Sequence, residues 1–237
     1  MKKGIILQFL VIFHFIGISQ KEKPTNLPKF DGRKYHFGFL LSFNSATYYI
    51  DRQDDYTFND SIVNIKLDRK PGFNLNIVAS LNPTPNFNLR FTPGLDFQER
   101  VLTYQVKVDD STSKSYDKIL ESTYLNFPLL LKFRTNRINN FAAYALGGGY
   151  FAMDMANNKD VENNGPLEQL TVKTNKFDYG YTVGAGFDFF LMYFKFGIEL
   201  KFNVGLKNIL EQDNTFFSYP LQSIKTGSWV FSFTFEG

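Results

Sequence analysis

Eight charged residues of this sequence fall within otherwise apolar stretches, where ionic side chains could support chemistry or conduct ions. The eight are Arg90, Asp96, Lys132, Arg134, Asp188, Lys195, Glu199 and Lys201. Charges removed from bulk water must be paired with one another or kept hydrated. The set therefore fits either a structural network of ion pairs or a path for an ion or solute, and we predict the structural network.

Residue types that serve nucleophilic or metal chemistry are scarce. The chain has no Cys, which excludes disulfides, zinc thiolate sites and thiol nucleophiles. Of its two histidines, His14 falls in a segment that we expect to be removed, and His36 has no close acidic neighbour in the sequence. No arrangement of residues has the roles that an enzyme mechanism needs. The sequence therefore predicts a protein that is not an enzyme, with no catalytic residue, no metal site and no cofactor.

The stretch 123–134, which positions Lys132 and Arg134, alternates between two faces as a β-strand does. Its odd positions carry Thr, Leu, Phe, Leu, Leu and Phe, whereas its even positions carry Tyr, Asn, Pro, Leu, Lys and Arg. A helix would need its apolar residues at spacings of three and four. The same alternation recurs about eight times along the chain, and this recurrence is typical of a membrane β-barrel.

We predict eight strands joined alternately by long loops and short turns. The strands are expected at residues 35–48, 72–81, 87–104, 123–134, 141–153, 177–189 and 193–204, and in the C-terminal stretch where Trp229, Phe231, Phe233 and Phe235 share a face. Long loops are expected near residues 49–70, 107–121, 157–176 and 207–222. Alternation does not assign the faces of 141–153, where three successive glycines from Gly147 indicate a tight or bent place in the wall.

The composition favours a lipid-facing outer wall. The chain has 28 Phe and 13 Tyr, although charged residues make up 21% and the mean hydropathy is -0.22. Such an aromatic excess without a long apolar helix suits a barrel with lipid outside and polar residues inside. We therefore predict an all-β fold: an eight-stranded antiparallel transmembrane β-barrel of the outer membrane, an up-and-down meander over residues 35–237. An even number of strands puts both termini on the periplasmic side and the long loops outside the cell.

The N-terminal residues have the pattern of a secretory signal peptide. Lys2 and Lys3 precede an apolar run at 5–16, and Gly17 and Ser19 are small, so we predict a signal peptide at 1–19 and a mature chain that begins near Gln20. The run is shorter than the roughly 20 residues of a membrane-spanning helix. Residues 20–34 are predicted to be an extended periplasmic lead-in. Removing 1–19 lowers the formal charge from +3 to +1, so no strong field for nucleic acid follows.

A soluble up-and-down barrel with its apolar face inward is the alternative fold. Periodicity alone does not tell which face lies inside. Three features favour lipid outside: the signal peptide, the aromatic rows, and the glycines that cluster on the polar face, where a narrow barrel needs small residues. The interior of an eight-stranded barrel is just wide enough for side chains to fill it, which argues against a solute path.

Two details of the wall can be predicted from the sequence. Pro128 lies in mid-strand without an N–H to donate, so we expect a bulge or a water molecule there. If Leu191 and Met192 form a two-residue hairpin, then Asp188 lies opposite Lys195, Gly184 opposite Glu199, and Thr182 opposite Lys201. Glu199 would then face only a glycine and should reach Lys132 or Arg90 on another strand.

Short segments along the chain combine in a pattern known from one family. They are His36-Phe37-Gly38-Phe39, Leu89-Arg90-Phe91-Thr92-Pro93-Gly94-Leu95, Phe127-Pro128-Leu129-Leu130-Leu131-Lys132-Phe133, Arg137 with Asn139-Asn140, Asp178-Tyr179-Gly180 with Gly184-Ala185-Gly186, Phe194-Lys195-Phe196, and Gly205-Leu206-Lys207-Asn208-Ile209. In the full combination the mature chain resembles the PorT family of outer-membrane β-barrels from bacterial type IX secretion. The pieces Pro128–Lys132 and Gly205–Ile209 alone also fit a broader group of outer-membrane barrels from the same bacteria. The resemblance implies a non-enzymatic role in protein secretion, and in gliding where the cell glides. It brings no catalytic residues.

We therefore expect an integral outer-membrane accessory component of the type IX secretion machinery that acts by contact with other proteins. A small outer-membrane channel or solute-binding barrel is the alternative, and a soluble barrel for an apolar ligand is a third possibility. The expected partners are outer-membrane lipid and other protein components of the machinery. No nucleic acid and no small-molecule substrate are expected.

Overall fold

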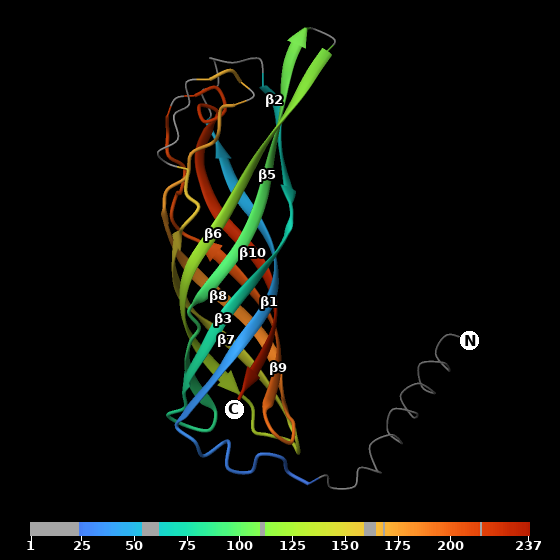
Figure 1. Cartoon of the computed structure of the whole chain (residues 1–237), viewed down its shortest axis with the longest axis vertical. Helices are drawn as coiled ribbons and strands as arrows, with labels where there is room; N and C mark the ends of the chain where they lie inside the picture. The colour runs from blue at the N-terminus through green and yellow to red at the C-terminus, as the bar shows by residue number, and fades with distance from the viewer. Residues whose placement is uncertain (1–23, 54–61, 110–111, 159–164, 168, 214) are drawn as a thin grey trace, which may run out of the picture.

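The computed structural model describes residues 24–53, 62–109, 112–158, 165–167, 169–213 and 215–237. These parts of the chain form ten β-strands (Figure 1): β1 Tyr35–Arg52, β2 Ile62–Arg69, β3 Pro71–Leu81, β4 Phe87–Phe91, β5 Gly94–Asp109, β6 Thr112–Arg134, β7 Phe141–Asp154, β8 Phe177–Phe190, β9 Lys195–Gly205 and β10 Leu221–Glu236. The described residues include no helix that is long and apolar enough to cross a membrane. The predicted signal peptide at 1–19 and the start of the mature chain near Gln20 lie outside the described residues.

The ten strands form one closed sheet with eight strands around the wall, because two wall strands are each interrupted once. β2 and β3 follow one another on either side of Lys70, and β4 and β5 on either side of Thr92 and Pro93. β1 pairs with β3 on one side and with β10 on the other, which closes the ring. Neighbouring strands run antiparallel throughout, so the predicted eight-stranded up-and-down barrel is confirmed.

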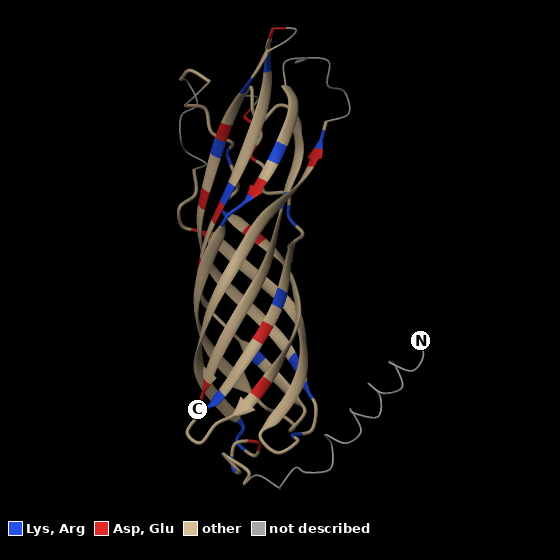
Figure 2. Cartoon of the chain, turned by 90° about the vertical axis from the view of Figure 1, so that its right-hand side faces the viewer, with Lys and Arg blue, Asp and Glu red and all other residues tan. Residues whose placement is uncertain are grey.

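The two ends of the barrel differ. The turn end carries the short connections 82–86, 135–140 and 191–194, and β1 begins and β10 ends there. At the opposite end, the loop end, β5 and β6 rise above the rest of the wall (Figure 1). Charged residues gather on the loop-end part of the ribbon in Figure 2.

The alternation of side chains places apolar residues outside and polar residues inside. Phe39 is 51% exposed on the outer face, whereas its neighbour Leu40 is 1% exposed. Outer rings meet across strand pairs, such as Phe39 with Phe235 (centroids 4.8 Å apart). Cross-strand aromatic contacts of this kind stabilise a sheet. In β7 the even positions face inward, because Ala142, Tyr144 and Leu146 are buried. The structure thus assigns the faces that the sequence left open.

Two strand pairs extend further toward the loop end than the sequence predicted. The predicted loop 49–70 contains β2, and most of the predicted loop 107–121 belongs to the hairpin of β5 and β6, which pairs from Gly94–Asn126 to Asp109–Thr112. The loop prediction failed there because the outer face of this hairpin carries polar residues such as Ser113 and Ser115. Apolar alternation marks a strand only where one face contacts lipid or a core.

An apolar core fills the barrel at the loop end. Its buried members are Tyr48, Ile62, Leu102, Tyr104, Val106, Leu120, Leu170, Val172, Ile209, Leu210, Phe217, Leu221 and Ile224. They come from the upper ends of the strands and from the segments 165–176 and 206–220. The tyrosine Tyr104 donates its hydroxyl hydrogen to the carbonyl of Phe217 (3.0 Å). The sequence predicted these two segments to be polar loops, and their few apolar residues instead close the loop end.

The register of β8 with β9 differs from the predicted hairpin by two residues. Phe190 pairs with Lys195, Gly186 with Glu199 and Gly184 with Lys201. The connection therefore has four residues, 191–194, and Leu191 N–H donates to the Phe194 carbonyl (3.0 Å). Phe190 stays in the sheet because its N–H donates to the Asn140 carbonyl (2.9 Å) and its side chain is buried. A shift of two residues keeps every side chain on its face, so the luminal side of both strands is unchanged.

The wall keeps its register through Pro128, so the predicted bulge is wrong. Phe91 pairs with Leu129 and Gly94 with Asn126, which is one continuous register on β6. The Thr92 N–H donates to the Pro128 carbonyl (3.1 Å). The Thr92 carbonyl, which Pro128 cannot serve, accepts a hydrogen bond from Asn76 Nδ2 (3.3 Å). A side-chain amide thus replaces the missing backbone donor, as a buried carbonyl requires.

An Arg on the outer wall should prevent assembly in the membrane. Leu129 on β6 and Leu200 on β9 are 50% and 51% exposed on the outer face, and each lies within a row of apolar residues that face outward on its strand. Arg at the bilayer midplane of such a barrel costs roughly 2–4 kcal/mol. We expect Leu129→Arg and Leu200→Arg to lose the compact, heat-modifiable form on gels, while Leu129→Ala and Leu200→Ala retain it. If both Arg variants stayed heat-modifiable, the outer face would not contact lipid.

Candidate functional site

The eight charged residues predicted for the polar face are all buried inside the barrel. Six of them lie together toward the turn end, joined by two residues that were not predicted. We call this set the charged cluster: Arg90, Lys132, Tyr144, Asp188, Lys195, Glu199, Lys201 and Glu236. Arg134 lies apart, at the turn end, and Asp96 lies beside a small cavity on the other side of the cluster.

Arg90 on β4 is the centre of the charged cluster. Its Nη1 donates to Glu199 Oε1 on β9, and its Nη2 donates to Glu236 Oε1 on β10 (2.5 Å). One guanidinium therefore links β4 to β9 and β10, which are not its neighbours in the wall. The planar fork of Arg suits two carboxylates at once better than the point charge of Lys does. Glu199 thus reaches one of the two bases proposed for it.

The remaining charges form pairs around this centre. Lys132 Nζ lies 2.8 Å from Asp188 Oδ2 and 3.4 Å from the centre of the Tyr144 ring. The other ammonium contacts are Lys195 Nζ with Glu236 Oε2 at 2.9 Å, Lys195 Nζ with Asp188 Oδ2 at 3.7 Å, and Lys201 Nζ with Glu199 Oε2 at 3.3 Å. The Tyr144 hydroxyl donates to Glu199 Oε1 (2.9 Å). Every charge in the cluster has an opposite charge beside it, as buried ions require.

Glycines on β8 make room for the long side chains of the cluster. A Cβ at Gly186 would collide with the Tyr144 ring, and a Cβ at Gly184 would collide with the Lys201 side chain. Both glycines face the lumen opposite charged residues of β9. The inner wall therefore has no side chain at the two positions that lie against Tyr144 and Lys201 of the cluster.

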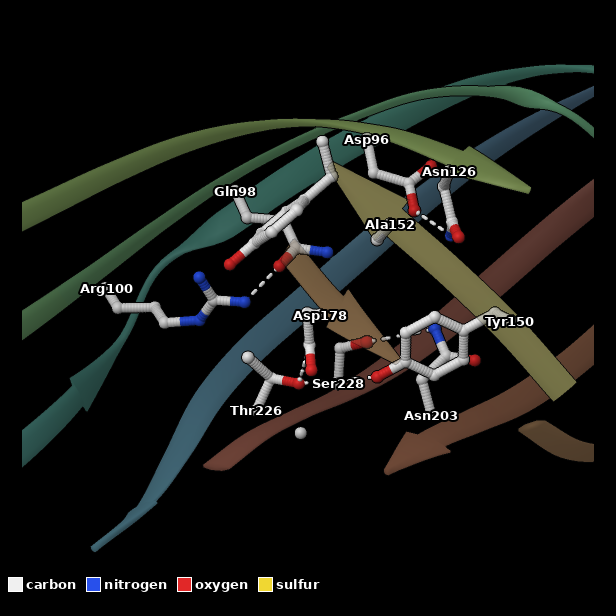
Figure 3. A pocket seen from close by; sticks show the side chains of 12 residues that line it. Asp96, Gln98, Arg100, Asn126, Tyr150, Ala152, Asp178, Asn203, Thr226 and Ser228 are labelled. Atoms are coloured by element: carbon white, nitrogen blue, oxygen red, sulfur yellow. Dashed lines mark hydrogen bonds between the residues drawn. The ribbon is translucent and has the colours of Figure 1, made fainter. Parts of the chain in front are cut away.

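Two cavities above the cluster are each large enough for about one water molecule. Each leaves ≈ 20 Å³ for the centres of water-sized molecules, and one water needs roughly 10–15 Å³ on this measure. Figure 3 shows the first cavity, with Asp96 beside Asn126 and Asp178 beside Thr226. Asp96 Oδ1, Asn126 Oδ1 and Asp178 Oδ1 have no hydrogen-bond partner among the described residues. These oxygens are suited to hold ordered water, and the space is too small for a solute.

Several luminal residues were not predicted as part of the polar network. Glu236 is 1% exposed and Arg100 is 1% exposed. Glu236 follows Phe235 at the end of the last strand, so the alternation of that strand already pointed it inward. Arg100 is packed against the Tyr48 ring, 4.5 Å from its centre, and donates to Gln98. Arg100 is also an even position of the predicted strand 87–104, like Arg90 and Asp96, so the alternation of that strand already pointed it inward.

Residues 24–34, which we call the strap, cross the turn end of the barrel (Figure 1). Phe30 of the strap is 3% exposed and stacks on the His36 ring (centroids 3.8 Å apart). It also meets Phe190 edge to face (5.8 Å), and the Lys195 ammonium lies 5.1 Å from its ring centre. Phe30 therefore seals the lumen below the charged cluster. The prediction of an extended lead-in missed this role.

Polar contacts fix the strap to the turns. Asp31 pairs with Arg134 (2.6 Å) and Arg137 (3.5 Å). Asn26 N–H donates to Asn140 Oδ1 (2.8 Å), and Arg137 Nη2 donates to the Asn26 carbonyl. Partial burial lowers the pKa of Arg137 and Asp31 opposes this shift, but a guanidinium starts so high that it stays charged at neutral pH. The strap is thus held by charge pairs as well as by Phe30.

Comparison with protein families places this geometry in a known group. The family model of the outer membrane protein beta-barrel domain matches residues 18–211. The chain belongs to this family. An outer-membrane location and a lipid environment around the outer wall follow from membership. No curated protein matches the chain.

Solved structures of other outer-membrane barrels are similar to the chain at low sequence identity. OprG from Pseudomonas aeruginosa is 12% identical, with a TM-score of 0.49, and the match covers 86% of this chain and 95% of OprG. The attachment invasion locus protein Ail of Yersinia pestis, solved with the heparin analogue sucrose octasulfate, is 13% identical with a TM-score of 0.40, covering 86% and 100%. Neisserial surface protein A is 10% identical with a TM-score of 0.40, covering 84% and 96%. Likenesses this distant carry no argument about function.

The buried pair Lys132–Asp188 should be strongly coupled in stability. Removing one member of a buried pair leaves the other uncompensated and costs roughly 3–5 kcal/mol. We expect Lys132→Met and Asp188→Asn each to lower the free energy of unfolding in micelles, and the double variant to lose much less than the two single losses added. The exposed pair Lys66–Asp68 (3.4 Å) is the control, with a coupling of about 0–1 kcal/mol. Additive losses for Lys132 and Asp188 would mean that the two side chains do not interact.

Removing the Phe30 ring should loosen the turn end. Phe→Ala in a packed core costs roughly 3–5 kcal/mol, so Phe30→Ala should unfold at lower denaturant and expose the strap to added protease. Phe37→Ala is the control, because the Phe37 ring is 65% exposed on the outer wall. Equal stability and equal cleavage of the two variants would show that the strap does not seal the barrel.

Proposed function

We propose that this protein acts by contact with other proteins, as an accessory component of the type IX secretion machinery in the outer membrane, and of gliding where the cell glides. The observation that carries the proposal is the filled lumen. In the parts of the chain that the structure describes, side chains fill the lumen, so the barrel offers other proteins its ends and its outer wall. The protein is therefore proposed to act through its exposed surfaces, where other proteins can bind.

Three successive layers support the closed lumen. Phe30 and the strap cover the turn end, the charged cluster lies directly above Phe30, and the apolar core fills the loop end. The two cavities above the cluster each have room for about one water molecule. An eight-stranded barrel is narrow enough for side chains to fill completely. Conduction through the lumen would require the ion pairs and both end layers to move.

The assignment to type IX secretion comes from the resemblance to the PorT family. Two of the segments that carry the resemblance have structural roles here: Arg90 centres the charged cluster, and Pro128 lies beside the break between β4 and β5. Both termini of the barrel lie at the turn end, which we assign to the periplasm, and the long loops to the outside of the cell. The protein is proposed not to be an enzyme. Among the described residues no three His, Asp or Glu side chains are grouped as metal ligands, and His36 is stacked under Phe30.

Deletion of the gene should abolish export of type IX cargo and leave uptake of small solutes nearly unchanged. Cargo is measured in the culture medium by immunoblot, and uptake by the entry rate of a fluorescent dye. Complementation with the intact gene should restore export. Normal export in the deletion strain would contradict the secretion assignment.

A change in uptake would favour the channel instead. The purified protein in planar bilayers separates the two functions, because a filled lumen predicts no steady conductance above that of the lipid alone. Regular single-channel steps in planar bilayers would contradict the closed barrel, whatever the deletion strain exports.

A further inference from the structure

The turn end carries an exposed surface of one sign of charge. Lys29, Arg33 and Lys34 on the strap are all exposed, and no ion pair of theirs occurs in the described parts of the chain. The strap's one acid, Asp31, is shared by two arginines, Arg134 and Arg137. The three turns 82–86, 135–140 and 191–194 contain no acidic residue. The described turn end is therefore strongly positive.

Apolar side chains stand out beside these charges. Ile138, Met192 and Tyr193 occupy the turns and are 71%, 73% and 87% exposed. The connection 191–194 consists of Leu, Met, Tyr and Phe, whereas turns that face water favour Gly, Pro, Asn, Asp and Ser. Protruding apolar residues at a polar boundary mark an interaction site.

The strap and the apolar turns form one continuous surface. Asn26 Nδ2 donates to the Phe190 carbonyl at the start of the 191–194 turn (3.0 Å), and Arg137 donates to the Asn26 carbonyl beside Ile138. At its other end the strap contacts the 82–86 turn, where Asn82 N–H donates to the Lys34 carbonyl (2.7 Å). The cations thus lie on a segment that runs over all three turns. We call this the turn-end surface: Lys29, Arg33, Lys34, Ile138, Met192 and Tyr193.

We propose that the turn-end surface docks an acidic segment of another protein, with Met192 and Tyr193 packing against its apolar residues. Charge complementarity identifies the partner, because carboxylates are what an unbalanced set of cations attracts. Aromatic residues, Met and Arg are enriched in protein interfaces, and this surface contains all three. The inference rests on the proposed function for placing this end in the periplasm. It names the face and the chemistry of the contact.

A synthetic peptide that alternates Glu and Leu is the probe in solution. The protein is embedded in nanodiscs of neutral phosphatidylcholine, and binding is followed by fluorescence anisotropy. We expect binding that weakens with salt, weakens about tenfold or more in the variant Lys29→Glu/Arg33→Glu/Lys34→Glu, and weakens also in Met192→Ser/Tyr193→Ser. The control variant Lys66→Glu/Lys70→Glu/Lys176→Glu reverses three exposed cations at the loop end and should bind as the original protein does. Equal binding by the turn-end and loop-end variants, or no binding at all, would overturn the proposal.

Anionic lipid is the other source of negative charge that could bind this surface. In nanodiscs that contain phosphatidylglycerol, this lipid could gather around the original protein but not around the turn-end variant, Lys29→Glu/Arg33→Glu/Lys34→Glu. If it did so and the peptide did not bind, the surface would be assigned to lipid and the proposal would be overturned.

In cells, the turn-end variant should reach the outer membrane in heat-modifiable form yet lose cargo export, while the loop-end variant exports normally. Export lost on deletion but normal in the turn-end variant would reject this face and leave the proposed function standing. Normal export on deletion would reject the function, while the peptide assay still decides the binding.

Discussion

The narrowness of an eight-stranded ring is the constraint on which the rest of the structure depends. The backbone of a membrane-spanning sheet must be hydrogen-bonded throughout, so the sheet closes on itself, and at eight strands the interior has room only for side chains. The charges of the cluster must then pair with one another inside the lumen. Arg90 does so by joining Glu199 and Glu236. Gly184 and Gly186 follow from the same shortage of space.

The same constraint separates the barrel into layers with different chemistry. The charged cluster lies toward the turn end, single-water cavities lie above it, and apolar side chains fill the loop end. Each end is closed by residues that are not part of the membrane-spanning wall. The strap closes one, and the segments 165–176 and 206–220 help to close the other.

This division explains how much could be predicted from the sequence. Alternation in 123–134 and its repeats was enough for the fold and for the luminal side of Arg90, Lys132 and Glu199, because lipid on one face imposes a strict period of two. Alternation does not fix register, so a four-residue turn at 191–194 passed as a two-residue hairpin. Toward the loop end the pattern changes, because the outer face is polar and the apolar side chains point into the core, which hid β2 and the upper part of the β5–β6 hairpin. The role of Phe30 could not be predicted, because a single aromatic residue in a polar segment has no periodic signal.

The contacts of the strap have a consequence for the order in which the molecule assembles. Asn26 binds residues 114 and 164 positions further along the chain, Asn140 and Phe190. The strap, which precedes every strand in the chain, therefore cannot reach its final place until β6, β7 and β8 stand side by side. Contacts so distant in sequence form late, because a long loop must close before they contribute. The strap can therefore occupy its docked position only in a molecule in which most of the ring has already formed.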